Sequence, residues 1–299
     1  MTPEHSRDVV NTYRYLRGTM IALLLLLLIS VGYQWWWETG HSCWLGSISA
    51  YYFTPVRTVF VGSLCALGAV LIAYKGHSPE EDVLLNFSGF MAFVVAMVPT
   101  VPDGLCGPNA YTQSATEIAM AVRNNIWSLI LVAVLAAVVV VVLRRTSAGR
   151  RAPAAGRPAT RTMVVTVICA GILLGELTLF LVLRDRFIAL SHGIAAGTMV
   201  AGVIAVMVLN ALRADERHGG GEGAKYRRTY ILLAVALGVL LALTVVVALT
   251  LTGFDHLILI AEVIIILLFG VYWLVQTVEL WNLGSTEPTE SRELQTVAE

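Results

Sequence analysis

The chain has 299 residues, of which 57% are hydrophobic and only 13% are charged, and its mean hydropathy is +0.76. A soluble domain carries about 25% charged residues, so a water-soluble fold of this length would lack the charge to cover its surface. Twenty basic and twenty acidic residues cancel, which excludes the positive surface of a nucleic-acid-binding protein. The composition therefore predicts an all-α integral membrane protein with no nucleic acid among its partners.

Apolar runs along the chain define the expected membrane spans. A bilayer core is crossed by about 20 apolar helical residues, because backbone polar groups must bond to one another in hydrocarbon. Eight segments meet this requirement, near residues 18–37, 57–74, 83–101, 124–143, 163–183, 189–210, 230–252 and 256–277. We expect them to form one bundle of eight transmembrane helices over residues 1–283. Residues 284–299 are polar and acidic, which predicts a disordered cytoplasmic tail.

Basic side chains orient the bundle. With the N-terminus inside, sixteen of the twenty Lys and Arg residues fall in cytoplasmic segments. The four on the outside are Arg57, Arg123, Arg184 and Arg186. This asymmetry is a strong positive-inside signal. The sequence therefore predicts a multi-pass protein of the cell membrane with both termini in the cytoplasm, as an even number of spans requires.

Three connecting segments are interpreted from their composition. Residues 144–162 combine Arg with Ala, Gly and Pro, which predicts a flexible cytoplasmic linker. Residues 213–228 have a Gly-rich centre, and we expect a hinge there. Residues 111–125 place apolar side chains on one helical face, which predicts a short interfacial helix on the outer side.

The first outer loop, which begins near His41, is too aromatic and too apolar for a merely solvated loop. It presents hydroxyl groups on Ser47, Ser49, Tyr51 and Tyr52. Such a surface would suit a lipid headgroup or a protein partner. A loop that folds back and caps the helix bundle explains the same composition, so both interpretations stay open.

Two cysteines are expected to pair on the outer side. Cys43 lies in the first outer loop and Cys106 in the second, whereas Cys65 and Cys169 fall inside spans. Disulfides persist in oxidising compartments. The topology therefore predicts a Cys43–Cys106 disulfide.

Ionisable residues inside the spans are the main candidates for function, because charges are costly in hydrocarbon. At 1.5 Å per residue, Glu176 and Glu262 each lie roughly 10 Å inside the outer ends of their helices. His192 and His256 open the sixth and eighth spans on the same side. These four residues predict an outward-facing pocket around a carboxylate pair, where a small solute or lipid is bound or moved.

Small residues point to the same region. Gly171 and Gly175 precede Glu176 at helical spacing, and Gly193 and Gly197 follow His192 in the same way. Small residues four apart allow helix backbones to approach closely. We therefore expect a tight hairpin of the fifth and sixth spans that holds Glu176 beside His192.

Other functions remain open at this point. His41, His192 and His256 are the candidate ligands of a zinc ion, which would activate water for lipid hydrolysis. No HxxxH or HExxH spacing supports such a site. A scaffold or assembly subunit would instead dock a protein partner on the aromatic outer loop. The leading expectation is a non-enzymatic protein without a cofactor, whose partners are membrane lipids and a small solute or lipid ligand.

One stretch resembles a known group of membrane proteins. Residues 47–76, SISAYYFTPVRTVFVGSLCALGAVLIAYKG, are similar to the outer loop and second span of the Frag1/DRAM/Sfk1 group and related bacterial proteins. In that group a first span with its N-terminus inside is followed by a Ser-rich outer loop, a Pro and an apolar helix that begins with Phe. The resemblance covers the first half of the chain. It implies a role in membrane lipid handling or trafficking and transfers no catalytic residue.

Overall fold

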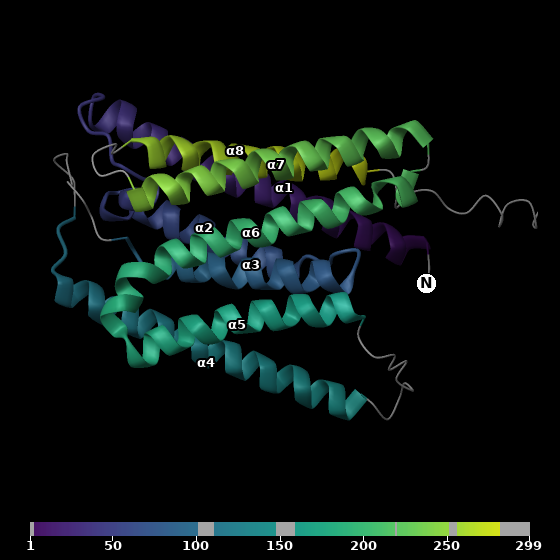
Figure 1. Cartoon of the computed structure of the whole chain (residues 1–299), viewed down its shortest axis with the longest axis horizontal. Coiled ribbons are helices and arrows are strands. Elements are labelled where there is room, and N and C mark those ends of the chain that lie inside the picture. Colours follow the sequence, from purple (N-terminus) through teal and green to yellow (C-terminus); the bar gives the residue numbers. More distant parts are fainter. Residues whose placement is uncertain (1–2, 101–110, 148–158, 219, 251–255, 282–299) are drawn as a thin grey trace, which may run out of the picture.

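The computed structural model describes residues 3–100, 111–147, 159–218, 220–250 and 256–281, and within them the chain forms eight α-helices and no strand (Figure 1). The helices are α1 Pro3–Tyr33, α2 Arg57–Ala73, α3 Pro79–Met97, α4 Ala115–Ser147, α5 Thr160–Val182, α6 Arg184–His218, α7 Gly220–Thr250 and α8 Leu257–Glu279. Each predicted span coincides with one of these helices. The prediction of an all-α fold is therefore confirmed.

Six of the helices, α1 and α4 to α8, are long and apolar enough to cross a membrane. Their outward faces are apolar too. On α4, for example, Leu131 and Leu135 are more than 60% exposed. Soluble proteins rarely expose contiguous apolar surface of this extent. The fold is therefore that of a helical protein embedded in a membrane.

A π-helical turn, Gln34–Glu38, extends α1 and holds three consecutive tryptophans. Trp36 and Trp37 are 52% and 69% exposed, whereas Trp35 packs against the ring of Trp44 at 4.7 Å. Tryptophan rings concentrate at the boundary between hydrocarbon and water. The turn therefore fits a membrane boundary at this end of α1.

Helix α3 lies at the centre of the bundle, where it contacts α2, α4, α5 and α6. Its side chains Met91, Ala92 and Ala96 have no exposed surface. A Cβ atom added to Gly89 would lie 2.6 Å from the Gly68 carbonyl oxygen on α2. The absence of side chains at Gly68 and Gly89 is therefore what allows the α2 and α3 backbones to touch.

The expected close packing at the other glycines is wrong. A Cβ atom added to Gly171, Gly175, Gly193 or Gly197 would meet nothing within 4 Å. Close approach to α6 occurs instead at Gly202, where an added Cβ would overlap Ser88 Oγ of α3. Spacing alone does not distinguish a glycine that faces a helix from one that faces open space.

Two of the three connecting segments differ in structure from the sequence-based expectation. The predicted hinge is helical up to His218 and again from Gly220, and an ion pair of 2.7 Å joins Arg227 to Asp215 across the hairpin. The expected interfacial helix is not separate, because α4 begins at Ala115 and continues without a break. Residues 148–158 of the expected linker and 282–299, which include the expected tail, lie outside the described residues.

The α2–α3 contact generates a prediction about stability. Gly89→Leu places a side chain against the α2 backbone and should destabilise the protein by about 1–3 kcal/mol, because neither helix can move without disturbing the bundle. Thermal unfolding in detergent measures the loss as a lower Tm. Gly171→Leu on α5 is the matched control and should leave the Tm unchanged. Equal effects of the two variants would contradict close packing at Gly89.

Candidate functional site

A cavity of about 1000 Å³ lies between α1, α2, α6, α7 and α8. This volume is at the upper end of the range for small-molecule pockets. Its long walls are apolar and include Leu24, Leu67, Leu71, Leu237, Ile265 and Phe269. The cavity is therefore large enough and apolar enough to accept a hydrocarbon chain.

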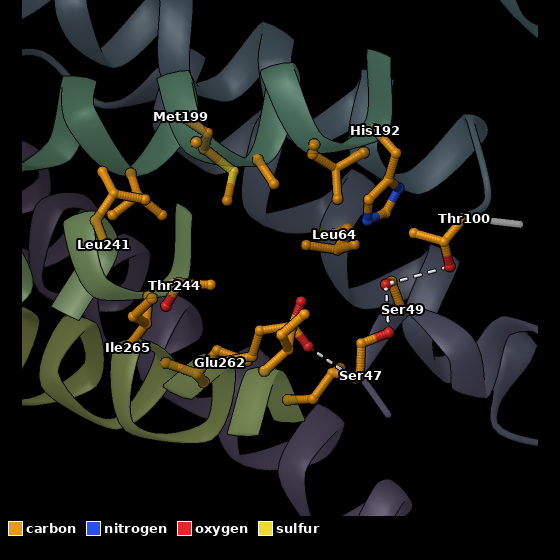
Figure 2. A pocket seen from close by; sticks show the side chains of 18 of the residues that line it. Ser47, Ser49, Leu64, Thr100, His192, Met199, Leu241, Thr244, Glu262 and Ile265 are labelled. Carbon is orange, nitrogen blue, oxygen red and sulfur yellow. Dashed lines mark hydrogen bonds between the residues drawn. The ribbon is translucent and has the colours of Figure 1, made fainter. Parts of the chain in front are cut away.

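Polar side chains gather at one end of this cavity (Figure 2). Ser49 Oγ lies 2.9 Å from Ser47 Oγ and accepts a hydrogen bond of 3.4 Å from Thr100 Oγ1. Glu262 of α8 and His192 of α6 come from opposite walls and point into the space between them. The site thus joins a polar end, built from the outer loop and two helices, to an apolar body.

Glu262 is held by the outer loop. Its Oε2 accepts a hydrogen bond of 2.6 Å from the backbone N–H of Ile48. One turn earlier on α8, the N–H of Leu259 donates to the Gly46 carbonyl oxygen at 3.0 Å. The first N–H groups of a helix have no partner within the helix, so this carbonyl caps α8. The two bonds fix residues 46–48 on the outer end of α8.

No described basic side chain neutralises Glu262, since none of the ion pairs within the described residues includes it. The Glu262 side chain lines the cavity, and its Oε1 is the oxygen that does not bond to Ile48. An isolated carboxylate in apolar surroundings is costly unless a ligand or a proton compensates it. The described residues of the cavity therefore supply no positive charge that pairs with the ionised Glu262.

His192 has a defined hydrogen bond. Its Nδ1 lies 2.6 Å from the carbonyl oxygen of Val98, just beyond the end of α3. Because a carbonyl only accepts, Nδ1 carries a proton, and in the neutral form of the ring Nε2 is an acceptor. The residue is 7% exposed, and its ring forms part of the cavity wall.

Glu176 does not line the cavity, so the structure does not bring the two expected carboxylates into one pocket. The expected α5–α6 hairpin does form, and Ser191 Oγ donates a hydrogen bond to Glu176 Oε2. His192 is the next residue, but its ring is turned to the cavity instead. Glu176 Oε1 is buried without a hydrogen-bond partner among the described residues.

The other histidines are separated. His256 precedes the first residue of α8 and lines the cavity, with its ring 5.6 Å from that of Trp44. His41 packs between the rings of Trp35 and Trp36, at 4.8 and 4.2 Å. In the described part of the chain, no three His, Cys, Asp or Glu residues lie close enough to hold a metal ion. The expected zinc ligands therefore do not converge.

The outer loop folds back onto the bundle. Tyr51 and Tyr52, in the 3₁₀ helix Ser49–Phe53, are 2% and 3% exposed. Ser47 and Ser49 line the cavity. These four residues therefore do not form an exposed docking surface, and the capping alternative fits the structure.

The expected disulfide is not tested. Cys43 is buried in the outer loop, whereas Cys106 lies outside the described residues. Cys65 and Cys169 are free thiols. The Cys43–Cys106 disulfide stays a prediction.

Sequence analysis missed a second polar site, which we call the inner network. It lies at the opposite end of the bundle and consists of Glu81, Asn210, Arg217, Tyr230, Tyr272 and Glu279. Arg217 pairs with Glu279 at 3.1 Å, and Tyr230 donates a hydrogen bond to the same carboxylate. The sequence contains a signal for this network, because Glu81 and Glu279 are acidic residues at the cytoplasmic ends of predicted spans, where basic residues are usual.

Asn210 connects the two halves of the inner network. Its Nδ2 donates to Glu81 Oε1 at 3.0 Å and to Tyr272 Oη at 3.2 Å, while its Oδ1 accepts from Arg217 at 2.9 Å. These residues come from α3, α6 and α8. With Tyr230 of α7, the network therefore joins four helices beneath the cavity.

Glu81, which precedes the third predicted span, has a shifted pKa. Burial acts to raise the pKa of its carboxyl group, but hydrogen bonds from His77 and Asn210, together with the charge of the His77 ring, hold that pKa below its usual value. The ionised form is therefore the one that the fold stabilises.

Comparison with protein-family models, with curated proteins and with solved structures finds no match to this chain. The resemblance of residues 47–76 to the Frag1/DRAM/Sfk1 group stays a prediction. The function is therefore argued from the geometry of the site.

The inner network generates a prediction about a buried ion pair. Glu279→Gln leaves the largely buried Arg217, whose side chain is 13% exposed, without its anionic partner, which should cost about 3 kcal/mol of stability. Asp215→Asn is the control, because it breaks the exposed pair with Arg227 and should cost less than about 1 kcal/mol. Denaturant unfolding in detergent compares the two. A similar loss in both variants would show that burial of the Glu279 pair is unimportant.

The pKa of Glu81 generates a prediction about pH. Its contribution to stability is complete above the pKa of an unfolded glutamate, about 4.3, and is lost as the pH falls through the lower folded-state pKa. We expect the Tm of the wild type to drop on acidification from pH 6 to pH 3, and the drop to be smaller in Glu81→Gln. Parallel pH profiles for the two proteins would contradict this role.

Proposed function

We propose that the protein is an eight-span protein of the cell membrane that binds a lipid-like amphiphile in the cavity. The observation that carries this proposal is the division of one cavity into an apolar body and a polar end. An amphiphile has the same division, so its chain would lie along Leu67 and Phe269 while its headgroup meets Glu262 and His192. The solute or lipid of the sequence analysis is thereby narrowed to a lipid.

The position of charges supports an orientation with both termini in the cytoplasm. In Figure 1 the N-terminal end of α1 lies at the same end of the bundle as the α6–α7 connection. Arg213 on α6 lies 3.8 Å from Glu80 at the start of α3, so Lys75, which pairs with Asp82 in the same turn, lies at this end as well. Basic segments face the cytoplasm in most membrane proteins. The polar end of the cavity is then on the outer side.

An opening between α6 and α7 supports entry from the bilayer. The two helices are joined at the inner end and diverge toward the outer end (Figure 1). The cavity is lined there by Ala189 and Gly193 of α6 and by Val245 and Ala248 of α7, and all four are exposed. A lipid would therefore pass between these helices without leaving hydrocarbon.

The inner end of the cavity is closed. Tyr272 and Trp273 follow Phe269 on α8 and are 0% and 1% exposed, and Tyr272 is itself part of the inner network. We therefore favour binding at the outer leaflet over passage through the protein. The predicted Cys43–Cys106 disulfide would strengthen the outer loop that covers this site.

Two alternatives have less support. A metal-dependent hydrolase needs ligands that converge, and the described histidines are apart. A scaffold that docks through the outer loop needs exposed aromatic side chains, and Tyr51 and Tyr52 are buried. The cavity serves neither of these functions directly.

A bulky residue in the cavity tests the proposal. Gly197→Trp should weaken binding of radiolabelled hexadecanol, a neutral probe with one chain, by about tenfold or more, because the indole ring occupies the space of the chain. The added Cβ meets nothing within 4 Å, so the helix itself tolerates the change. Equilibrium binding to the purified protein in a neutral detergent gives the dissociation constant.

Gly175→Trp is the matched control for this experiment. Gly175 is also free of contacts, but it is exposed on α5 and does not line the cavity. Its affinity for hexadecanol should equal that of the wild type. Unchanged binding in Gly197→Trp, or no saturable binding to the wild type, would overturn the proposed function.

A further inference from the structure

The described lining of the cavity contains one carboxylate, two histidines and several hydroxyl groups, but no Lys or Arg. The carboxylate is that of Glu262. Proteins bind phosphate groups through Arg, Lys or clusters of free backbone N–H groups. The charge of the lining therefore disfavours a phosphate headgroup.

Two backbone donors at the polar end are already used. The N–H of Ile48 donates to Glu262, and the N–H of Leu259 donates to the carbonyl oxygen of Gly46. A phosphate would have to compete with the Glu262 carboxylate for the first of these donors, beside a like charge. Because the Ile48 N–H is occupied, the groups that remain for a ligand are mainly hydrogen-bond acceptors.

Acceptors are plentiful at the same place. Glu262 keeps a second carboxylate oxygen, and His192 in its neutral form offers Nε2 as an acceptor because Nδ1 bonds to Val98. Ser47 and Ser49 add hydroxyl oxygens 2.9 Å from one another. A protonated primary amine has three N–H donors and no acceptor. Its hydrogen-bonding capacity and its charge both match this end of the cavity.

We infer that the ligand is an amphiphile with a protonated amine headgroup, which pairs with Glu262 between the outer loop and α6. This inference rests on the proposed function, because it names the headgroup of the lipid that the cavity binds. The amine supplies the positive charge that Glu262 lacks among the described residues. The apolar walls take the chain.

Three probes with the same chain test the headgroup. Hexadecylamine, hexadecanol and hexadecyl phosphate are compared by equilibrium binding to the purified protein in a neutral detergent. We expect the wild type to bind the amine at least about tenfold more tightly than either of the other probes. A phosphate affinity equal to or greater than the amine affinity would overturn the inference, whatever the variants do.

Glu262→Gln keeps the shape of the side chain and removes its charge. It should abolish the preference for the amine while hexadecanol binding stays within about twofold of the wild type. Glu176→Gln is the matched control, because Glu176 is a buried glutamate outside the cavity, and it should keep the full preference. A preference that survives in Glu262→Gln, or disappears in Glu176→Gln, would contradict a direct pair.

The two proposals fail in different ways. If all three probes bind the wild type equally and Gly197→Trp blocks them all, the cavity binds lipids but the amine inference is wrong. If none of the probes binds in a saturable manner, the proposed function itself is wrong. Only an amine preference that depends on Glu262 supports both.

Discussion

The hydrogen bond from the Ile48 N–H to Glu262 is the contact on which the outer half of the protein depends. It joins residues that are 214 positions apart and places the outer loop over the end of α8. The neighbouring bond from Leu259 to Gly46 gives the same arrangement a second attachment. Together with the buried side chains of Tyr51 and Tyr52, these bonds hold the loop that forms the outer wall of the cavity. A buried carboxylate, usually a cost to stability, is here part of the structure that encloses the site.

The two ends of the bundle are built differently. At the inner end, Asn210, Arg217 and Glu279 join α3, α6 and α8 through buried hydrogen bonds and an ion pair. At the outer end, α6 and α7 diverge in Figure 1, and residues of both helices line the cavity. The buried contacts of the inner network hold the helices together beyond the closed end of the cavity.

Sequence patterns predicted the helices well, because each span needs a continuous apolar run in hydrocarbon. They also identified Glu262 and His192, since polar groups inside spans are conspicuous. They failed where the outcome depends on which helix faces which. Glu176 and Glu262 share a depth, but the direction in which α5 presents Glu176 separates it from the cavity. In the same way, Gly197 and Gly202 look equivalent in sequence, although only Gly202 touches α3.

The depth of Glu262 has a consequence for the surrounding bilayer. The exposed rings of Trp36 and Trp37 mark the membrane boundary, whereas Glu262 lies five residues, or roughly 8 Å, beyond the first residue of α8. A headgroup at this carboxylate would be submerged below the headgroups of neighbouring lipids. Its chain would then reach roughly 8 Å deeper toward the bilayer midplane than the chain of a neighbouring lipid of the same length. The protein would thus discriminate by chain length as well as by headgroup, since a long tail must bend or protrude into the opposite leaflet.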